Sequence, residues 1–222
     1  MSEIWNKMQA CAEAMRYKMK EAGYEVTDPN AHKYHWENHI YHSDNYRRGH
    51  VEVVDQREHY GLFILHATVF PHVTSDAPIW GFDAVCGANK ITGAFHDFSL
   101  VGTDDHAMYQ WFKNKTENIS WKKERMLPPW AQAIFSPAMV AAGNVQELNE
   151  VDQFITLGLD ALDYYLENSV KFTQNTANYT AEQNRYCHFQ KQNPHVVRSM
   201  VSMGYDQSNI EQFVQEILFP EI

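Results

Sequence analysis

Two histidines and two carboxylic acids lie within three short segments whose composition is typical of β-strands. The segments, rich in β-branched and aromatic residues, are HVEVV, GLFILHATVF and WGFDAVCG. Because successive side chains of a strand point to opposite faces, His50 and Glu52 share one face, and neighbouring strands can add His66 and Asp83 to it. Burial moves the pKa values of such groups towards neutrality. We therefore expect a surface on which protons can be transferred near neutral pH.

The same residues admit plainer interpretations. A single strand histidine is more often a packed or exposed side chain than a functional one, and an Asp after Trp-Gly-Phe is commonly a strand-end residue. Spacing alone leaves the structural and functional interpretations about equally favoured. A third interpretation is a facial triad of His50, Glu52 and His66 that binds a non-haem metal. The spacing of these three residues does not match the usual cupin run, which counts against that triad.

A second group of histidines occurs in the polar segment 24–49. If this segment were helical, the spacings of three and four residues would put them on one helix face, where they could bind a metal adventitiously. The polar composition instead favours a covering loop or an irregular strand, and we expect no genuine metal site there. The group consists of His32, His35, His39 and His42.

Further elements are expected on either side of these strands. Apolar residues at spacings of three and four predict a helix over 3–22, with Gly23 as its C-cap. A fourth strand is predicted over 90–98, with Thr92, Ala94 and His96 on one face. The segment between this strand and the motif LPPW is polar and rich in lysine, and no element is predicted there. The two prolines of LPPW stiffen the backbone, as in a pocket lid or a plain turn.

The C-terminal third reads as a series of helices. One is predicted over roughly 145–170 and opens with a capping box of Asn144 and Glu147. Similar boxes predict helices that open at Thr180 with Gln183 and at Ser208 with Glu211, and between them Asn193 is expected to cap a helix that begins at Pro194. A helix, then strands, then helices predict an α/β fold with a mostly antiparallel sheet.

Composition restricts the class of protein. The 222 residues, 44% of them hydrophobic, suit a single domain over 1–222, and the net charge of −10 argues against nucleic-acid binding. No apolar run approaches the roughly 20 residues that span a bilayer, so we expect a cytoplasmic protein without a membrane segment. We also expect a monomer. The three cysteines form no CxxC pair, and no glycine-rich nucleotide motif is present. If the protein is a redox enzyme, its electrons must come from outside.

Several of these segments resemble the ferredoxin-dependent bilin reductases. HVE, the LH of GLFILHATVFP and IWGFDAVCG resemble the bilin-binding sheet of that family. KERMLPPWAQAIFS resembles the loop that closes its pocket, and YCHFQKQNPHVVR with the terminal ILFPEI resembles its last helices. The likeness runs from about Arg47 to the C-terminus and is strongest to phycocyanobilin-forming members and their short virus-borne relatives. It implies a three-layer α/β/α sandwich, with the bilin between the sheet and the C-terminal helices.

The resemblance also implies an activity, which is the reduction of biliverdin IXα by single electrons from ferredoxin through a bilin radical, with no bound metal or flavin. Asp83 falls on the family's central proton donor. By the same likeness His66 would relay the proton, His50 would orient His66, and Glu52 would serve a terminal ring. Arg125 would bind a propionate. Weaker matches to the family's pocket residues are Trp130, Thr92, Gln190 and Asn193. A non-catalytic bilin carrier remains an alternative.

Two departures from the family pattern concern the product. Phycocyanobilin-forming members have Asn-Asp-Lys where this chain has Asn193, Pro194 and His195, so that an acid and a base are lost beside the pocket. The chain also lacks their longer N-terminal region. The four sheet residues favour phycocyanobilin. The loss at Pro194, together with the likeness to short virus-borne members that yield phycoerythrobilin, favours phycoerythrobilin through 15,16-dihydrobiliverdin, and we expect the latter.

Docking of ferredoxin is expected to need a local basic patch, because ferredoxins are commonly acidic and this chain is acidic as well. The candidate residues are Arg47, Arg48, Lys113, Lys115, Lys122, Lys123, Arg185 and Arg198.

Overall fold

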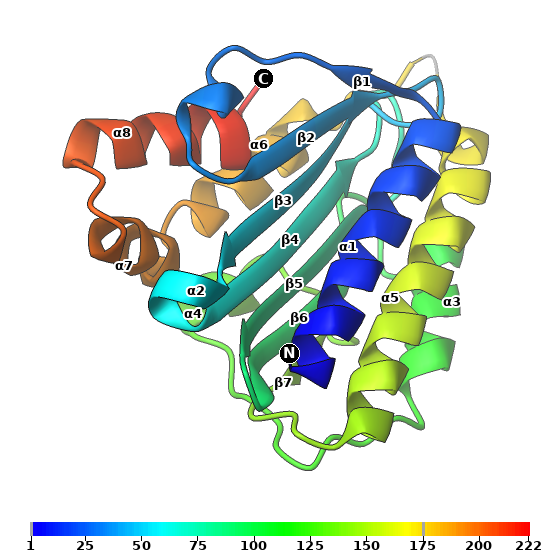
Figure 1. Ribbon diagram of the computed structural model, residues 1–222. Helices are drawn as coiled ribbons and strands as arrows, with labels where there is room; N and C mark the ends of the chain where they lie inside the picture. The colour runs from blue at the N-terminus through cyan, green and yellow to red at the C-terminus, as the bar shows by residue number, and fades with distance from the viewer. Residues whose placement is uncertain (1, 175) are drawn as a thin grey trace.

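The computed structural model describes residues 2–174 and 176–222, which form one sheet with helices on both faces (Figure 1). The strands of the sheet follow chain order and pair antiparallel throughout. The predicted antiparallel sheet and all four predicted strands are therefore confirmed. The strands are β1 (Tyr24–Val26), β2 (Glu37–His42), β3 (Arg48–Gln56), β4 (Leu62–Phe70), β5 (Ile79–Gly87), β6 (Lys90–Ser99) and β7 (Val140–Ala142).

The helices form two layers, and the predicted α/β/α sandwich is confirmed. One face of the sheet is covered by α1 (Glu3–Glu21), α3 (Ala107–Thr116) and α5 (Leu148–Asn168). The other face is covered by α4 (Pro129–Gln132), α6 (Thr180–Gln190), α7 (Pro194–Ser202), α8 (Gln207–Gln212) and the π-helical η3 (Phe213–Leu218). Short elements elsewhere are α2 (Arg57–Tyr60), η1 (Ala31–Lys33) and η2 (Ser169–Phe172).

The face under α1 and α5 holds a continuous apolar core. The methionine stripe of α1 is buried there, as are Trp80, Phe82 and Phe98 of the sheet. Phe82 stacks on Phe154 of α5 with ring centroids 4.5 Å apart. Burial of aromatic and methionine side chains at this density is the main apolar contribution to folding. This face therefore fixes the sheet as a rigid platform.

The end of α1 differs from the prediction at Gly23. The C-cap is Ala22 with φ of −87°, and the positive-φ glycines of the described chain are Gly61 and Gly204. Gly23 is needed for another reason, since a Cβ there would overlap the carbonyl oxygen of His42. Close approach of two backbones, and not left-handed geometry, selects this glycine.

Three of the predicted helix starts are displaced. The N-cap of α5 is Glu147, whereas Asn144 lies before the helix with φ of 53°. Asp206 caps α8 in place of Ser208, and α6 follows Tyr179 without a side-chain cap. The prediction for α7 is confirmed. Asn193 directly precedes Pro194, the first residue of the helix, and its Oδ1 accepts from the backbone N–H of His195.

Two polar segments contain elements that their composition hides. Segment 24–49 contributes the edge strand β1 and its neighbour β2, so the covering-loop interpretation is wrong for these parts of it. His39 lies on β2 between Glu25 and Glu37, with ring nitrogens 2.6 and 3.0 Å from their carboxylates. The lysine-rich stretch contains α3, whose Met108, Tyr109 and Phe112 are buried.

A bulge in β6 changes which residues share a face. The register with β5 shifts between Val85 and Cys86, so Thr92 has no opposite partner. The Thr92 hydroxyl consequently donates to the Val85 carbonyl oxygen at 2.9 Å, while Ala94 is buried in the core under α5. Ala94 and His96 share the core face as predicted, whereas the expectation is wrong for Thr92, because the bulge breaks the alternation there.

Within the described chain, no helix has both the length and the apolar character needed to cross a bilayer.

Candidate active site

Three of the predicted residues form one row across the sheet. Glu52 of β3 is opposite His66 of β4, and His66 is opposite Asp83 of β5. Direct opposition in an antiparallel sheet puts side chains on the same face about 5 Å apart at Cβ. The row faces away from the apolar core and towards α7 and the C-terminal segment. The sequence pattern therefore placed these three side chains correctly.

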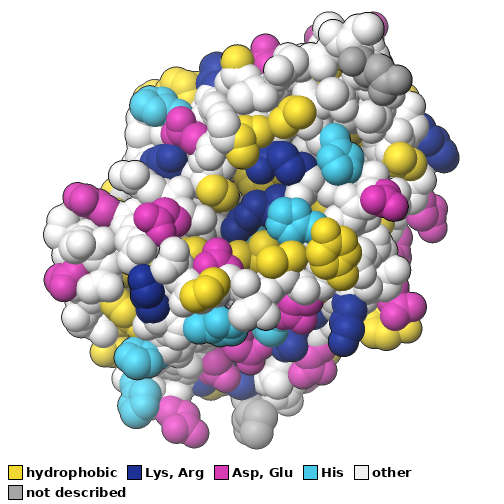
Figure 2. All heavy atoms as spheres, turned by 90° about the horizontal axis from the view of Figure 1, so that it is seen from above, with side chains coloured by type: hydrophobic (Ala, Val, Ile, Leu, Met, Phe, Trp, Pro, Cys, Tyr) yellow, Lys and Arg dark blue, Asp and Glu magenta, His cyan; other side chains and the backbone are white. Residues whose placement is uncertain are grey.

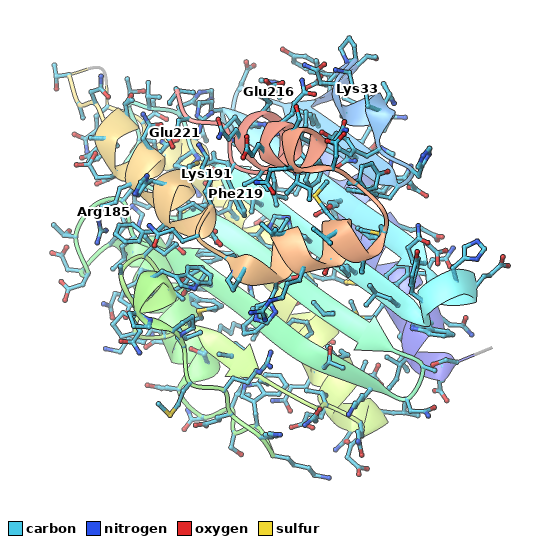
Figure 3. All side chains as sticks on the ribbon, turned by 90° about the vertical axis from the view of Figure 1, so that its left-hand side faces the viewer. Lys33, Arg185, Lys191, Glu216, Phe219 and Glu221 are labelled. Carbon is cyan, nitrogen blue, oxygen red and sulfur yellow. The ribbon has the colours of Figure 1, made fainter. Side chains whose placement is uncertain are left out.

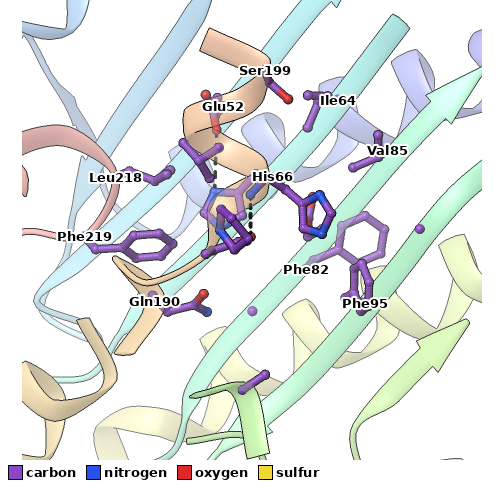
Figure 4. A pocket seen from close by; sticks show the side chains of 18 of the residues that line it. Glu52, Ile64, His66, Phe82, Val85, Phe95, Gln190, Ser199, Leu218 and Phe219 are labelled. Atoms are coloured by element: carbon purple, nitrogen blue, oxygen red, sulfur yellow. Dashed lines mark hydrogen bonds and ion pairs between the residues drawn. The ribbon is translucent and has the colours of Figure 1, made fainter. Parts of the chain in front are cut away.

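The row forms part of the wall of a cavity between the sheet and the C-terminal helices (Figure 4). Its volume is about 580 Å³, which lies within the roughly 300–1,000 Å³ typical of small-molecule sites. Leu218, the last residue of η3, and Phe219, which follows it, line the cavity opposite the strands, and Phe219 meets His66 edge to face at 5.7 Å. Figure 3 shows the C-terminal segment with Phe219 near Lys191 and Glu221, an ion pair of 2.7 Å that fastens the chain end to α6.

The two carboxylic acids of the row hold their protons near neutral pH. Burial raises the pKa of Asp83 to about 7. Burial, followed by the nearby charge of Asp83, raises the pKa of Glu52 to about 8. A ligand that fills the cavity would expel water from it and strengthen this desolvation. Both groups are therefore suited to donate a proton at neutral pH.

The two histidines remain neutral at the same pH. Burial and then the charge of Arg48 lower the pKa of His66 to about 4, and burial also lowers the pKa of His50 well below its usual value. His66 Nδ1 lies 3.8 Å from Glu52 Oε2, beyond hydrogen-bond distance. His50 is fully buried behind the cavity wall, and its Nε2–H donates to Asn38 Oδ1 at 3.1 Å. The rings of His50 and His66 meet edge to face at 6.4 Å without a hydrogen bond between them.

Arg48 is buried beside the histidines, and sequence reasoning assigned it to the surface. Its exposed fraction is 6%, and its Nη2 donates to the backbone oxygen of Ile217 at 2.5 Å. A residue this buried cannot take part in a docking patch, so that prediction is wrong for Arg48. The alternation that puts His50 and Glu52 on the inner face puts Arg48 there too, and this was the available signal.

The lid motif closes the other side of the cavity. Leu127, Pro128 and Trp130 line it, and Pro129 begins the short helix α4. Arg125 lines the cavity directly before the lid, with its guanidinium 5.6 Å from the centre of the Phe95 ring. Its side chain is exposed and forms no ion pair within the described chain. Such a guanidinium is available to bind a carboxylate.

The remaining predicted pocket residues, Thr92, Gln190 and Asn193, also line the cavity. The amide of Gln190 is already engaged, because its Nε2–H donates to the hydroxyl of Tyr186 at 2.8 Å. The side chain of Asn193 caps α7, so its structural role competes with ligand contact. Tyr186, which sequence reasoning missed, lines the cavity as well.

Asp97 is a further residue that sequence reasoning missed. Its carboxylate accepts from the N–H and the hydroxyl of Ser136, at 2.9 and 2.5 Å, and from the hydroxyl of Ser99 at 2.6 Å. Ser136 follows α4, so Asp97 fastens the end of the lid to β6. Burial, partly offset by these hydrogen bonds, raises the pKa of Asp97 to about 6.

Metal binding was an alternative for two groups of histidines. Within residues 2–174 and 176–222, no three His, Cys, Asp or Glu side chains come together as a metal site. His50, Glu52 and His66 therefore do not converge as a facial triad, since His50 Nε2 is hydrogen-bonded to Asn38 and the ring centres of the two histidines lie 6.4 Å apart.

Comparison with known proteins assigns the family. The family described as ferredoxin-dependent bilin reductase matches residues 1–220. The chain belongs to the ferredoxin-dependent bilin reductases. This bilin reductase is 29% identical over 191 residues to the phycocyanobilin:ferredoxin oxidoreductase of Gloeobacter violaceus, covering 82% of this chain and 72% of that protein. It is 24% identical to the phycocyanobilin:ferredoxin oxidoreductase of Prochlorococcus marinus strain MIT 9515, covering 87% and 80%.

Solved structures of similar fold agree with the assignment. The reductase superposes on PcyX with a TM-score of 0.71 and 25% identity, covering 97% of this chain and 99% of that chain. Tomato phytochromobilin synthase, solved in complex with biliverdin, gives a TM-score of 0.70 at 13% identity, covering 91% and 80%. The second likeness shows the shared fold.

Proposed function

We propose that this bilin reductase converts biliverdin IXα into a phycobilin, using single electrons from ferredoxin and protons held by the sheet. The observation that carries the proposal is the row of Glu52, His66 and Asp83 on the wall of a 580 Å³ cavity, with the pKa of Asp83 raised to about 7. The biliverdin complex of tomato phytochromobilin synthase supports the choice of ligand.

The bilin needs protons because a negative charge is unfavourable in the cavity. An electron added to a buried, neutral tetrapyrrole creates an anion in a medium of low dielectric, which is unfavourable unless a proton arrives with it. Asp83 supplies that proton to the bilin and is protonated again through its neighbours in the row. His66 and Glu52 hold the neighbouring positions, and His50 supports His66 from behind. No bound metal or flavin is required, because the conjugated bilin holds the unpaired electron between steps.

The substrate carboxylates are assigned to the open side of the cavity. Arg125 is exposed there and binds one propionate of biliverdin through charge-assisted hydrogen bonds. Trp130, Thr92, Gln190 and Asn193 complete the contacts with the rings.

Ferredoxin docks through surface lysines and arginines. Figure 2 shows Lys and Arg side chains together with a histidine near the middle of one face, with apolar side chains beside them. The exposed candidates from the sequence are Lys113, Lys115, Lys122, Lys123, Arg185 and Arg198.

The product we propose is phycoerythrobilin, formed through 15,16-dihydrobiliverdin. Every carboxylic acid among the described cavity-lining residues comes from the sheet, namely Glu52, Asp83 and Asp97. The opposite wall has Pro194 and His195 at the start of α7. A cavity without an acid on the helix side favours reduction of the bridge between the C and D rings over reduction of the D-ring vinyl group. Phycocyanobilin is the alternative product.

Anaerobic turnover of biliverdin with reduced ferredoxin, with chromatographic identification of products, tests the proposal. Bridge reduction shortens the conjugated system, so absorption should move early to shorter wavelength and end as phycoerythrobilin. An intermediate that keeps long-wavelength absorption and ends as a blue bilin would establish phycocyanobilin. Biliverdin that binds but is never reduced would identify a bilin carrier and refute the enzymatic assignment.

A further inference from the structure

Tyr186 brings a buried hydroxyl from α6 to the sheet. Its exposed fraction is 3%, and its ring is surrounded by Phe70, Phe135 and Phe219 at centroid distances of 5.9, 6.2 and 6.4 Å. The hydroxyl reaches the cavity-facing side of β5 at Gly81, where a Cβ would lie 3.4 Å from the oxygen. This distance corresponds to van der Waals contact, so the hydroxyl lies directly beside Gly81.

The hydroxyl has a defined orientation and an unused proton. Its oxygen accepts from Gln190 Nε2 at 2.8 Å, which fixes the oxygen in place. No described residue accepts a hydrogen bond from this hydroxyl. A tyrosine hydroxyl is both an acceptor and a donor, so the donor half remains available to a ligand in the cavity. A buried donor without a partner is costly, which favours a ligand that supplies an acceptor.

The place of this hydroxyl relative to Asp83 gives it a function. Gly81 and Asp83 face the same side of β5, two residues and therefore roughly 7 Å apart. Burial raises the pKa of Tyr186 far above its usual value, so the hydroxyl keeps its proton where Asp83 can release one. The two groups are thus a fixed hydrogen-bond donor and a transferable proton, side by side on one wall.

We propose that the Tyr186 hydroxyl donates a hydrogen bond to a terminal lactam oxygen of the bilin and thereby determines which part of the tetrapyrrole lies over Asp83. This inference rests on the proposed function. No bond is broken in the contact, and its consequence is positional. A lactam carbonyl held at Gly81 brings the adjoining ring and its bridge within reach of Asp83, so Tyr186 is a specificity-determining residue.

Tyr186→Phe tests the inference, because it removes the hydroxyl and keeps the ring in its aromatic surroundings. Tyr165→Phe is the matched control. Tyr165 is also buried, and its hydroxyl has no hydrogen-bond partner among the described residues, whereas that of Tyr186 accepts from Gln190; but Tyr165 lies in α5 on the opposite face of the sheet and packs on Phe98. Equal melting temperatures of the two variants would show that both retain the fold.

Three measurements on purified full-length protein would follow. We expect Tyr186→Phe to bind biliverdin roughly 2- to 10-fold more weakly, to raise the lactam carbonyl stretching frequency of the bound bilin, and to change the ratio of reduced products. Tyr165→Phe should match the wild type in all three. Identical affinity, lactam frequency and product ratio in Tyr186→Phe would overturn the inference.

The outcome is separable from that of the proposed function. If the wild type does not reduce biliverdin, the enzymatic assignment fails, while affinity and lactam frequency still test the contact with Tyr186. If the wild type reduces biliverdin and Tyr186→Phe behaves identically, the enzymatic assignment stands and the role of Tyr186 fails.

Discussion

The two faces of the central sheet use the same strands for opposite purposes. Each face contains a buried histidine whose pKa is lowered to about 4 by burial, His96 under α5 and His66 on the cavity wall. His96 is enclosed by Phe82, Phe98 and Phe112, and its Nδ1–H donates to the Gly81 oxygen at 2.7 Å. His66 instead lies between two carboxylic acids, Glu52 and Asp83, and faces the cavity.

The comparison shows that a shifted pKa does not by itself identify a functional histidine. On the core face, aromatic rings surround the imidazole and no acid lies opposite it, because Phe82 is its partner in β5. On the cavity face, Asp83 is the partner of His66 and lines the cavity, where we propose that it donates a proton to the ligand. The cavity face carries a cost in stability, since it buries two carboxylic acids beside its histidine.

The largest expected effect comes from removing the proton donor of the cavity face. Asp83→Asn keeps the size of the side chain and should lower turnover roughly 10²- to 10⁴-fold, the usual range for loss of a general acid. Binding of biliverdin should persist, because it rests on the propionates and apolar contacts. Electrons would then arrive without protons, so a bilin radical should accumulate in electron paramagnetic resonance spectra. Product formation at the wild-type rate with no added radical would contradict the role of Asp83.

A substitution on the core face should lower stability without changing the reaction. A Cβ on Gly158 of α5 would lie 2.5 Å from the ring of Phe82, so Gly158→Ala overpacks the core. We expect the free energy of unfolding to fall by about 1–3 kcal/mol, measured by denaturant titration. The identity of the reduced products should not change. A changed product ratio would show that the two faces are not independent.

The dependence of stability on pH distinguishes the faces further. The pKa values of Glu52 and Asp83 are raised in the folded state, to about 8 and about 7, so the folded protein binds more protons than the unfolded chain. Stability should therefore decline by about 1–2 kcal/mol as pH rises from roughly 6.5 to 8. The buried histidines, whose pKa values are lowered, cost stability only below roughly 6.5.

Denaturant titrations of the ligand-free protein across this pH range would measure the decline. Asp83→Asn and Glu52→Gln should each make it shallower, whereas Gly158→Ala should shift the curve without changing its slope. A stability that does not vary between pH 6.5 and 8 would show that the two acids are already ionised in the folded state.

The smallest effect is expected for the docking of ferredoxin, which takes place on the outer surface and on neither face of the sheet. Turnover at limiting ferredoxin should fall several-fold as the Debye length shortens from about 10 Å to about 3 Å, because the attraction between opposite charges is screened. Turnover at saturating ferredoxin is the control and should change less. A rate that does not change with salt concentration would contradict electrostatic docking of ferredoxin.

The sequence predicted best what depends on alternation along a strand. Glu52, His66 and Asp83 could be placed on one surface because a period of two fixes the face once the strands are neighbours. The same rule failed at Thr92, where a bulge inserts an unpaired residue whose presence depends on the partner strand.

Features that depend on tertiary contact could not be read from the sequence. Arg48 looks like a surface charge until the C-terminal segment supplies the Ile217 oxygen that it binds. The hydrogen bonds that join Asp97 to the end of the lid require Ser136, which is distant in the sequence. Similarly, α3 is a polar sequence with only one narrow buried side, so its composition resembles that of a loop.

Titration of Asp83 in the ligand-free protein tests the central claim most directly. Infrared difference spectra between the wild type and Asp83→Asn isolate the carboxyl band of this residue as pH is varied. The structure predicts that the protonated band of Asp83 disappears with a pKa of about 7. A band lost near the ordinary value of about 4 would show that the carboxyl is ionised at neutral pH and cannot be the proton donor of the cavity.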